Sequence, residues 1–334
     1  MLRRLAGIVA GRLLWALFLI VAVSVLVFVI FNVLPGGDIA AQRAGPHASP
    51  ADVEAVRHGL GLDRPVAVQY LIWMRDLFVH QDLGFSHYSD AEVGALILDR
   101  LPVTLMLMAG GAIVWLIGGL IAGVAASGRR GGALDRALGG ASLVAISAPV
   151  FWLGYMAMLG FAAGSGALIP VLPGVGAYLD AEGWFEHLTA LILPCLVLGV
   201  SLAAIYFRLT RATVGEQMES GYVAAARARG LPPRTVLWRH AARTGIVPIV
   251  GLAGIDMGMI LAGNLVIVET VFNVPGLGRL LTDGVSHSDA PVVQGVVIVS
   301  CLAVVVTMLV ADLLCAFLDP RLALADGSGR ESRP

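Results

Sequence analysis

Six long apolar stretches, separated by polar segments of unequal length, dominate this 334-residue sequence. They cover residues 10–32, 102–126, 137–162, 188–207, 246–272 and 291–317. A helix needs about 20 residues to cross a hydrocarbon core about 30 Å thick, and each stretch meets that length. The pattern therefore predicts an all-α polytopic membrane protein with six transmembrane helices.

The first apolar stretch has to be distinguished from a secretory signal. Its apolar run, residues 13–34, is longer than the apolar region of a signal, and no small-residue cleavage site follows it closely. We therefore expect this stretch to be a retained span.

The composition supports a membrane protein and excludes some chemistry. The chain is 58% hydrophobic and only 13% charged, which is too little charge for the surface of a soluble domain. All 22 basic residues are arginine, so the chain lacks the lysine of a Walker A phosphate loop. We expect no ATPase site, no catalytic site and no cofactor in this chain. With a net charge of −1 and no basic patch interleaved with aromatic residues, we also expect no nucleic-acid partner.

Most arginines lie in the amino-terminal end, in loops 127–136 and 207–245, and in the tail. Cytoplasmic loops carry such an excess, so both termini are predicted to be cytoplasmic. The predicted parts are the amino terminus with the first span (1–32), an extracytoplasmic segment (33–101), a core of five spans (102–317) and a tail (318–334).

The extracytoplasmic segment is too long for a simple connector. We expect three short helices in it, at residues 50–59, 65–79 and 90–100. The second carries apolar residues, among them Tyr70 and Trp73, at spacings close to one face of a helix. The segment is either a cap that protects the spans or a vestibule that receives a delivery protein.

The cytoplasmic loop 207–245 carries more pattern than an arginine-rich connector needs. Tyr222, Ala225, Ala226 and Arg229 recur at the spacing of one helical face, which is therefore rich in small residues. Gly230 supplies the left-handed or flexible exit of a helix. This pattern predicts a helix that fits into a groove of a separate motor protein.

A second short helix is predicted after the first. Pro232 and Pro233 stop the first helix and suit the start of another. Val236, Leu237 and His240 share one face of it, whereas Arg239 lies mostly elsewhere. An alanine-rich helix with arginines around it matches a groove with acidic walls.

Three carboxylates lie inside predicted spans: Asp256, Glu269 and Asp312, the last within about two turns of the internal end, where we expect it to reach water. Asp256 is ten residues into the fifth span, about 15 Å deep, where a charge is costly and faces a cavity or a partner group. It is either a pathway residue that meets cationic parts of a substrate or a packing residue hydrogen-bonded to a neighbouring helix. Met257 and Asn264 are further pathway candidates, although Asn264 suits bonding between helices better. Glu269 is near the external end, where we expect it to reach water.

Other polar and small residues predict structure rather than chemistry. Gly119 and Gly123 form a small-residue pair suited to close helix packing, within this chain or against a partner. The three cysteines all lie in apolar runs, which argues against a disulfide framework and a metal site. Five histidines in external sequence show no helical ligand spacing, so no metal site is predicted.

Several segments carry a family resemblance. Residues 219–248 resemble the cytoplasmic EAA loop of binding-protein-dependent ABC importer permeases, because Ala225-Ala226 and Gly230 match its Ala-Ala and Gly. Ala224 stands at the motif's glutamate, a departure that is common in the dipeptide and oligopeptide branch. Further segments resemble that branch in order: Phe31-Asn-Val-Leu-Pro-Gly-Gly-Asp38, Leu60-Gly-Leu-Asp-Arg-Pro65 with Gln69-Tyr70, Asp82-Leu-Gly-Phe-Ser86, Arg100-Leu-Pro-Val-Thr-Leu105, Glu269-Thr-Val-Phe-Asn-Val-Pro-Gly-Leu-Gly278, Pro291-Val-Val-Gln-Gly295 and Leu318-Asp-Pro-Arg321.

The resemblance implies a type I ABC importer permease fold in a bacterial cytoplasmic membrane. It implies a second, related permease as partner, two cytoplasmic ATPases that bind ATP and Mg, and an extracytoplasmic substrate-binding protein. The residues it implies in ATPase coupling are Glu219, Tyr222, Ala225, Ala226, Arg229, Gly230, Leu231, Arg239 and His240.

The substrate class implied by the resemblance is short peptides. Nickel or another small peptide-like solute is the alternative within the same class of transporter. A secondary transporter driven by an ion gradient is the alternative of another class. Against that alternative, the spans show no internal repeat and no pair of broken helices that marks an ion site.

Overall fold

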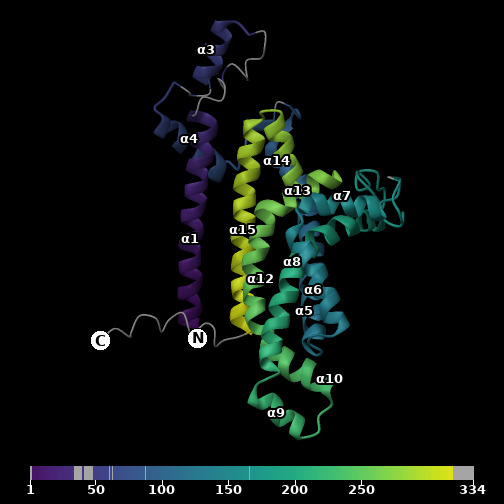
Figure 1. Ribbon diagram of the computed structural model, residues 1–334. Coiled ribbons are helices and arrows are strands. Elements are labelled where there is room, and N and C mark those ends of the chain that lie inside the picture. The colour runs from purple at the N-terminus through teal and green to yellow at the C-terminus, as the bar shows by residue number, and fades with distance from the viewer. Residues whose placement is uncertain are drawn as a thin grey trace. The chain divides into compact units, whose positions relative to one another are not determined.

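The computed structural model describes residues 2–33, 40, 48–59, 61, 63–86, 88–164 and 166–318, and these are mostly helical (Figure 1). The α-helices are α1 (Leu2–Phe28), α3 (Pro50–Gly59), α4 (Val66–Val79), α5 (Val93–Ser127), α6 (Ala133–Ser147), α7 (Val150–Phe161), α8 (Trp184–Gln217), α9 (Gly221–Ala228), α10 (Pro233–Thr235), α11 (Ala242–Gly245), α12 (Val247–Met259), α13 (Leu265–Phe272), α14 (Leu277–Ser286) and α15 (Ala290–Leu318). Three π-helical segments are η1 (Val29–Val33), η2 (Val236–Ala241) and η3 (Ile260–Asn264). Strands β1 (Phe85–Ser86) and β2 (Ala91–Glu92) pair antiparallel.

The described helices agree with the prediction of an all-α membrane protein. Four stretches are each long and apolar enough to cross a membrane, namely 14–33, 93–127, 184–217 and 290–310. The number rises to six if each of two bent helix pairs counts as one span. The predicted count of six spans is compatible with this structure.

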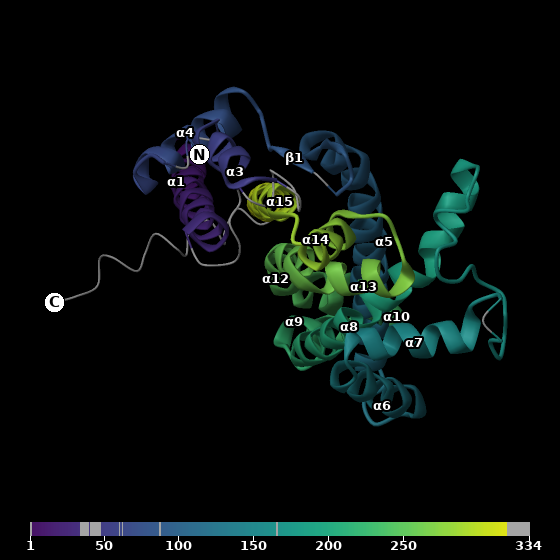
Figure 2. The same cartoon turned by 90° about the horizontal axis from the view of Figure 1, so that it is seen from above.

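The stretch 137–162, predicted as one span, is not a single continuous helix. Helices α6 and α7 meet at a bend of 118°, and Figure 2 shows α6 nearly end-on and α7 lengthwise. Ala148 has an extended backbone, with ψ 132°, and Pro149 precedes α7. A proline disfavours helical backbone at the residue before it, so the Ala148–Pro149 step ends α6.

Two other predicted elements also differ from the structure. The fifth stretch, 246–272, is not one regular helix, because η3 interrupts it between α12 and α13. The predicted helix at 90–100 is not separate, since Ala91 and Glu92 form β2 and α5 runs from Val93 through Pro102. Pro102 removes one backbone N–H and does not end the helix. In a span, neighbouring groups satisfy the freed carbonyl.

The described residues form two compact units. The first contains the described residues up to Pro102 together with Gly276–Ala303. Within it, α1 and α4 pack through aromatic rings, with Phe28 5.4 Å from Tyr70 and 5.7 Å from Trp73 between ring centroids. The Ser24 and Tyr70 hydroxyls also hydrogen-bond at 2.8 Å. The apolar face predicted for α4 is therefore used in packing.

A second contact in this unit joins the start of α5, just after the hairpin β1–β2, to α14 and α15. We name as the hairpin cluster the buried apolar side chains Val93, Ile97, Leu277, Leu280, Val292 and Val296. Gly295 allows close approach here, because a Cβ at this position would lie 2.7 Å from Val93 Cγ1.

The other unit contains Val103–Pro275 and the described residues from Val304 onward. Helix α8 is its longest helix and packs against α5. Gly119 and Gly123 make this contact close, since a Cβ would lie 2.7 Å from Tyr206 Cβ at the first position and 2.5 Å from Thr210 Cβ at the second. Of the two uses expected for this glycine pair, the structure shows packing within the chain.

Candidate functional site

The predicted coupling loop folds as a compact group of short helices at one end of α8 (Figure 1). Helix α9 follows α8 directly, and α10, η2 and α11 lead from it to α12. We name as the coupling cluster the buried side chains that hold these elements together: Val124, Val214, Val223, Ala226, Val236, Leu237, Ala241 and Ala242. All are aliphatic, so the loop is fixed by apolar packing against α5 and α8.

The link between α9 and α10 has the glycine turn and the proline helix start that the sequence predicts. Gly230 has φ +78°, a left-handed conformation that costs a residue with a side chain about 1–2 kcal/mol. Its N–H donates to the Arg227 carbonyl at 2.9 Å, which closes the end of α9. Pro232 then caps α10, and Pro233 occupies its first turn. The predicted sequence of helix, glycine turn and proline start is confirmed.

The two adjacent alanines of the loop have different surroundings. Ala225 is exposed, as are Arg229 and Tyr222, the last 44% exposed. Ala226 is only 7% exposed and belongs to the coupling cluster. The face predicted to carry both alanines is therefore divided: Ala225 lies on the surface, and Ala226 anchors α9 to the rest of the unit.

The remaining predicted coupling residues lie around this surface. Leu231 and Arg239 are exposed, and His240 is partly buried on η2. Glu219 is exposed and forms an ion pair with Arg130 at 3.2 Å. The Tyr222 hydroxyl donates to Gln217 Oε1 at 2.9 Å, which fixes the phenol ring beside the end of α8.

An ion pair at the base of the loop was missed by the sequence analysis. The Arg211 guanidinium of α8 donates to both carboxylate oxygens of Asp135 on α6, with Nη2 2.8 Å from Oδ2. The Gly131 N–H donates to the same Oδ2 at 2.8 Å. Asp135 is buried. A lone acid between arginines in loop 127–136 is the sequence signal that indicates such a pair.

Asp256 has a hydrogen-bond donor on a neighbouring helix. The Tyr206 hydroxyl of α8 donates to Asp256 Oδ2 at 2.7 Å. Tyr206 is fully buried and meets Trp115 edge-on at 5.2 Å between ring centroids. Met257 and Asn264 are each partly exposed, and no hydrogen bond of the described residues joins either side chain to Asp256.

The expectation that Glu269 reaches water is wrong. Its side chain is fully buried in α13, and the Thr104 hydroxyl of α5 donates to Oε1 at 2.8 Å. Thr104 and Glu269 belong to two of the family-like segments, 100–105 and 269–278. These segments therefore meet in the fold through a buried hydrogen bond.

Two more family-like segments meet at the hairpin cluster. The fully buried Ser86 hydroxyl of β1 donates to Asp289 Oδ2 at 2.5 Å. Gly84 faces Pro291, so that a Cβ at Gly84 would lie 3.1 Å from Pro291 Cβ. The segments 82–86 and 291–295 are thus parts of one structural contact.

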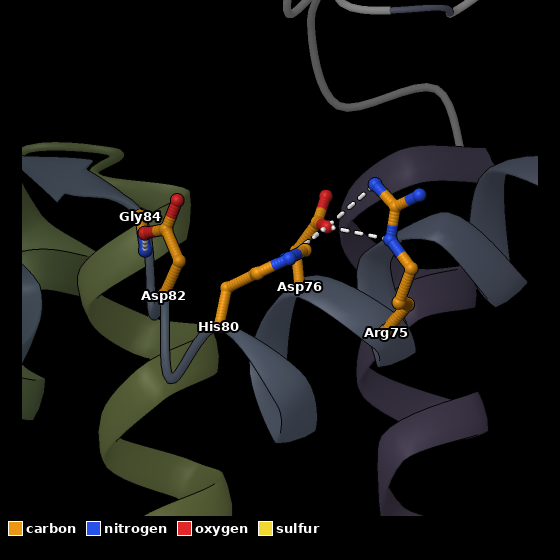
Figure 3. Close-up of polar contacts among 5 residues, drawn as sticks. All are labelled: Arg75, Asp76, His80, Asp82 and Gly84. Carbon is orange, nitrogen blue, oxygen red and sulfur yellow. Dashed lines mark hydrogen bonds and ion pairs between the residues drawn. The ribbon is translucent and has the colours of Figure 1, made fainter.

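Exposed polar contacts precede the hairpin (Figure 3). Arg75 donates to Asp76 Oδ1 from Nη2 at 2.8 Å and from Nε at 3.0 Å, and His80 Nδ1 lies 3.1 Å from the same oxygen. The Arg75 guanidinium, and after it the His80 ring, hold the pKa of Asp76 below its usual value. Asp82 Oδ1 accepts the Gly84 N–H at 2.8 Å and shapes the turn into β1.

Comparison with known proteins gives these contacts a family context. Residues 101–324 match the family described as binding-protein-dependent transport system inner membrane component, and residues 1–108 match its amino-terminal family. A probable peptide ABC transporter permease protein of Sinorhizobium fredii is 36% identical over 312 residues, covering 93% of this chain and 97% of the relative. A putative peptide transport system permease protein of Brucella abortus is 34% identical over 95% of this chain and 99% of the relative.

A third relative has a different named substrate. The glutathione transport system permease protein GsiC of Escherichia coli is 36% identical over 314 residues, covering 94% of this chain and 98% of that protein. The resemblance predicted from the sequence motifs is confirmed. This chain belongs to the family of binding-protein-dependent transport system inner membrane components and is a multi-pass permease subunit of an ABC transport system.

Proposed function

We propose that this chain translocates short peptides across the cytoplasmic membrane and is driven by ATP hydrolysis on partner subunits. Two relatives that match nearly the whole chain are named as peptide permeases, and a third is named for glutathione, itself a tripeptide. The chain has no lysine for a Walker A loop, which supports a motor on other subunits.

The observation that carries the coupling role is the two-sided structure of α9. Its inner side, with Val223 and Ala226, is fixed in the coupling cluster, whereas Tyr222, Ala225 and Arg229 are exposed. A helix that is anchored on one side and free on the other transmits a push to the helices that it packs on. Movement of a docked ATPase would thus reach α5 and α8 and shift the bundle between two states.

The arginine distribution supports a cytoplasmic location of this loop and of both termini. In the proposed assembly, a second related permease completes the pathway, and two ATPases bind ATP and Mg on the cytoplasmic side. An extracytoplasmic binding protein delivers the peptide. The chain itself carries no catalytic site in this proposal.

The test is peptide-stimulated ATPase activity of the complete complex in proteoliposomes, with di- to pentapeptides and nickel as candidate substrates. Ala225→Glu adds a charge to the exposed side of α9 and is expected to abolish stimulation while the complex still folds. Ala133→Glu, an exposed change at the start of α6 and outside the loop, is the matched control and should retain stimulation.

Three results would contradict the proposal in different ways. Stimulation by nickel alone would replace the peptide substrate with the metal. Uptake that follows an ion gradient without ATPases would make the chain a secondary transporter. Full stimulation in Ala225→Glu would remove the exposed side of α9 from the ATPase interface.

A further inference from the structure

Tyr206 hydrogen-bonds to Asp256 within the membrane-spanning part of the second unit. Its hydroxyl donates to Asp256 Oδ2 at 2.7 Å. The side chain is fully buried, its ring meets Trp115 edge-on, and its Cβ lies close to Gly119, where an added Cβ would be only 2.7 Å away. Contacts with two residues of α5 thus pack around Tyr206, and its O–H is directed at Asp256.

Asp256 lies at the edge of the packed side of α12. Ala253 and Ile249, one and two helical turns earlier on nearly the same side, are buried. Leu252 and Met259, which flank Asp256 on the other side, are 44% and 67% exposed. Asp256 itself is partly exposed. Its carboxylate is therefore bonded to α8, and the residue lies at the border of the exposed side of α12.

The bond from Tyr206 uses only part of the hydrogen-bonding capacity of this carboxylate. A carboxylate accepts bonds at both of its oxygens, and no ion pair of the described residues involves Asp256. A charged group at this depth faces a cavity or a partner group rather than lipid.

We infer that Asp256 contacts the substrate within the translocation pathway, where it binds the amino-terminal ammonium group of the peptide. Tyr206 is its positioning residue. This inference rests on the proposed function and names the part of the peptide that the permease recognises. An ammonium group offers three donors and a positive charge, which match the acceptor sites that Tyr206 leaves open on Asp256.

The helix around Asp256 also suits a moving pathway. The π-helical segment η3 begins four residues later, at Ile260. Such segments interrupt regular helices and are frequent at functional sites. A change in the length of this segment would turn Asp256 relative to Leu265 and the rest of α13, so one carboxylate would meet the substrate in one state and withdraw in the other.

The test compares uptake of a tripeptide with uptake of its N-acetylated form by the complete complex in proteoliposomes. Both are supplied at concentrations that saturate the binding protein. A change in the permease leaves the binding protein unaltered, so a changed ratio between the two peptides reports on the permease. Asp256→Asn should lower uptake of the free peptide relative to the acetylated one by about tenfold or more, as loss of a charge-assisted hydrogen bond predicts. Asp256→Glu should retain most of the preference.

Two further variants separate recognition from packing. Tyr206→Phe removes the hydroxyl and should lower the same ratio by less than Asp256→Asn does. Glu269→Gln changes a buried carboxylate in another helix, and it should affect both peptides equally. Equal effects of Asp256→Asn on both peptides would overturn the inference, since they would show a packing role. If the unaltered complex took up neither peptide, the proposed function itself would fail.

The accessibility of position 256 to a thiol reagent in water provides a second test, which does not require a functional carboxylate. In a permease whose native cysteines are replaced, Asp256→Cys should react with a water-soluble cationic thiol reagent. Absence of reaction, both without nucleotide and with vanadate-trapped ATPases, would show that position 256 faces lipid or protein and would overturn the inference.

Discussion

The coupling cluster and the hairpin cluster both join distant segments of the chain through aliphatic side chains, and they differ in the polar contacts beside them. The coupling cluster is entirely aliphatic, and its ion pairs lie outside it, as Arg130 does with Glu219. Beside the hairpin cluster, Ser86 and Asp289 share a buried hydrogen bond. Apolar packing tolerates small shifts of position, whereas a buried hydrogen bond has strict geometry. From this comparison we expect the coupling loop to move as one body. We expect the hairpin to keep the pairing of β1 with β2 fixed.

The largest effect is expected where a charge enters the aliphatic cluster. Ala226→Glu would place a carboxylate among Val223 and its neighbours without a partner. Burial of an unpaired charge destabilises by several kcal/mol, so α9 should detach from α8. Trypsin should then cleave rapidly after Arg227 and Arg229, and the thermal unfolding temperature should fall. Ala225→Glu is the adjacent control and should resist trypsin as the unaltered protein does. Equal cleavage of both variants would mean that Ala226 does not anchor α9.

A smaller effect is expected at the hairpin. Ser86→Ala removes the donor and leaves the buried Asp289 carboxylate without that bond, which costs about 1–3 kcal/mol. Hydrogen exchange of the amides of residues 83–92 should accelerate, while exchange in α9 stays the same. Ser89→Ala changes an exposed hydroxyl in the same turn and should have little effect. Unchanged exchange in Ser86→Ala would show that the apolar hairpin cluster alone fixes the register.

The two clusters also differ in how far the sequence predicts them. The turn at Gly230 and the start at Pro232 depend on local backbone preferences, so the sequence predicts them correctly. The orientation of α9 depends on which side meets Val214 of α8, a tertiary contact. Helical spacing grouped Ala225 with Ala226, although the apolar Val223 three residues before Ala226 marks the buried side.

The hairpin contact lies beyond local sequence patterns altogether. Ser86 and Asp289 are 203 positions apart, and nothing near either residue indicates its partner. The bend between α6 and α7 is a different case. Pro149 is a local signal for a helix break, but the hydrophobic pattern considered alone does not show that break. Apolar length predicts that a segment is in the membrane, and the proline within it determines where the helix breaks.

A backbone effect in the coupling loop is expected to be smaller still. Gly230 has open space where a Cβ would lie, so its left-handed φ is the only obstacle to a side chain. Gly230→Val should destabilise the turn by about 1–2 kcal/mol and reduce peptide-stimulated ATPase activity. Asparagine tolerates this conformation, so Gly230→Asn should stay close to the unaltered protein. If the two variants lost activity equally, the surface at Gly230 rather than its conformation would be what the ATPase requires.

The smallest effect concerns the polar contacts before the hairpin and appears only in acid. The Arg75 and His80 contacts lower the pKa of Asp76 from an ordinary 3.8. Because the pKa of Asp76 is lower in the folded chain than in the unfolded chain, the ionised carboxylate stabilises the fold. This contribution is complete above about pH 4 and is lost as the pH falls through the lowered pKa. Carbon-13 NMR of labelled aspartate, with Asp76→Asn to assign the signal, should show titration below the ordinary range. Arg75→Gln should raise that midpoint more than His80→Gln does, since the guanidinium bond is the larger cause. A midpoint that Arg75→Gln leaves unchanged would show that the arginine contact does not persist in solution, and the end of α4 would then depend on its apolar packing against α1 alone.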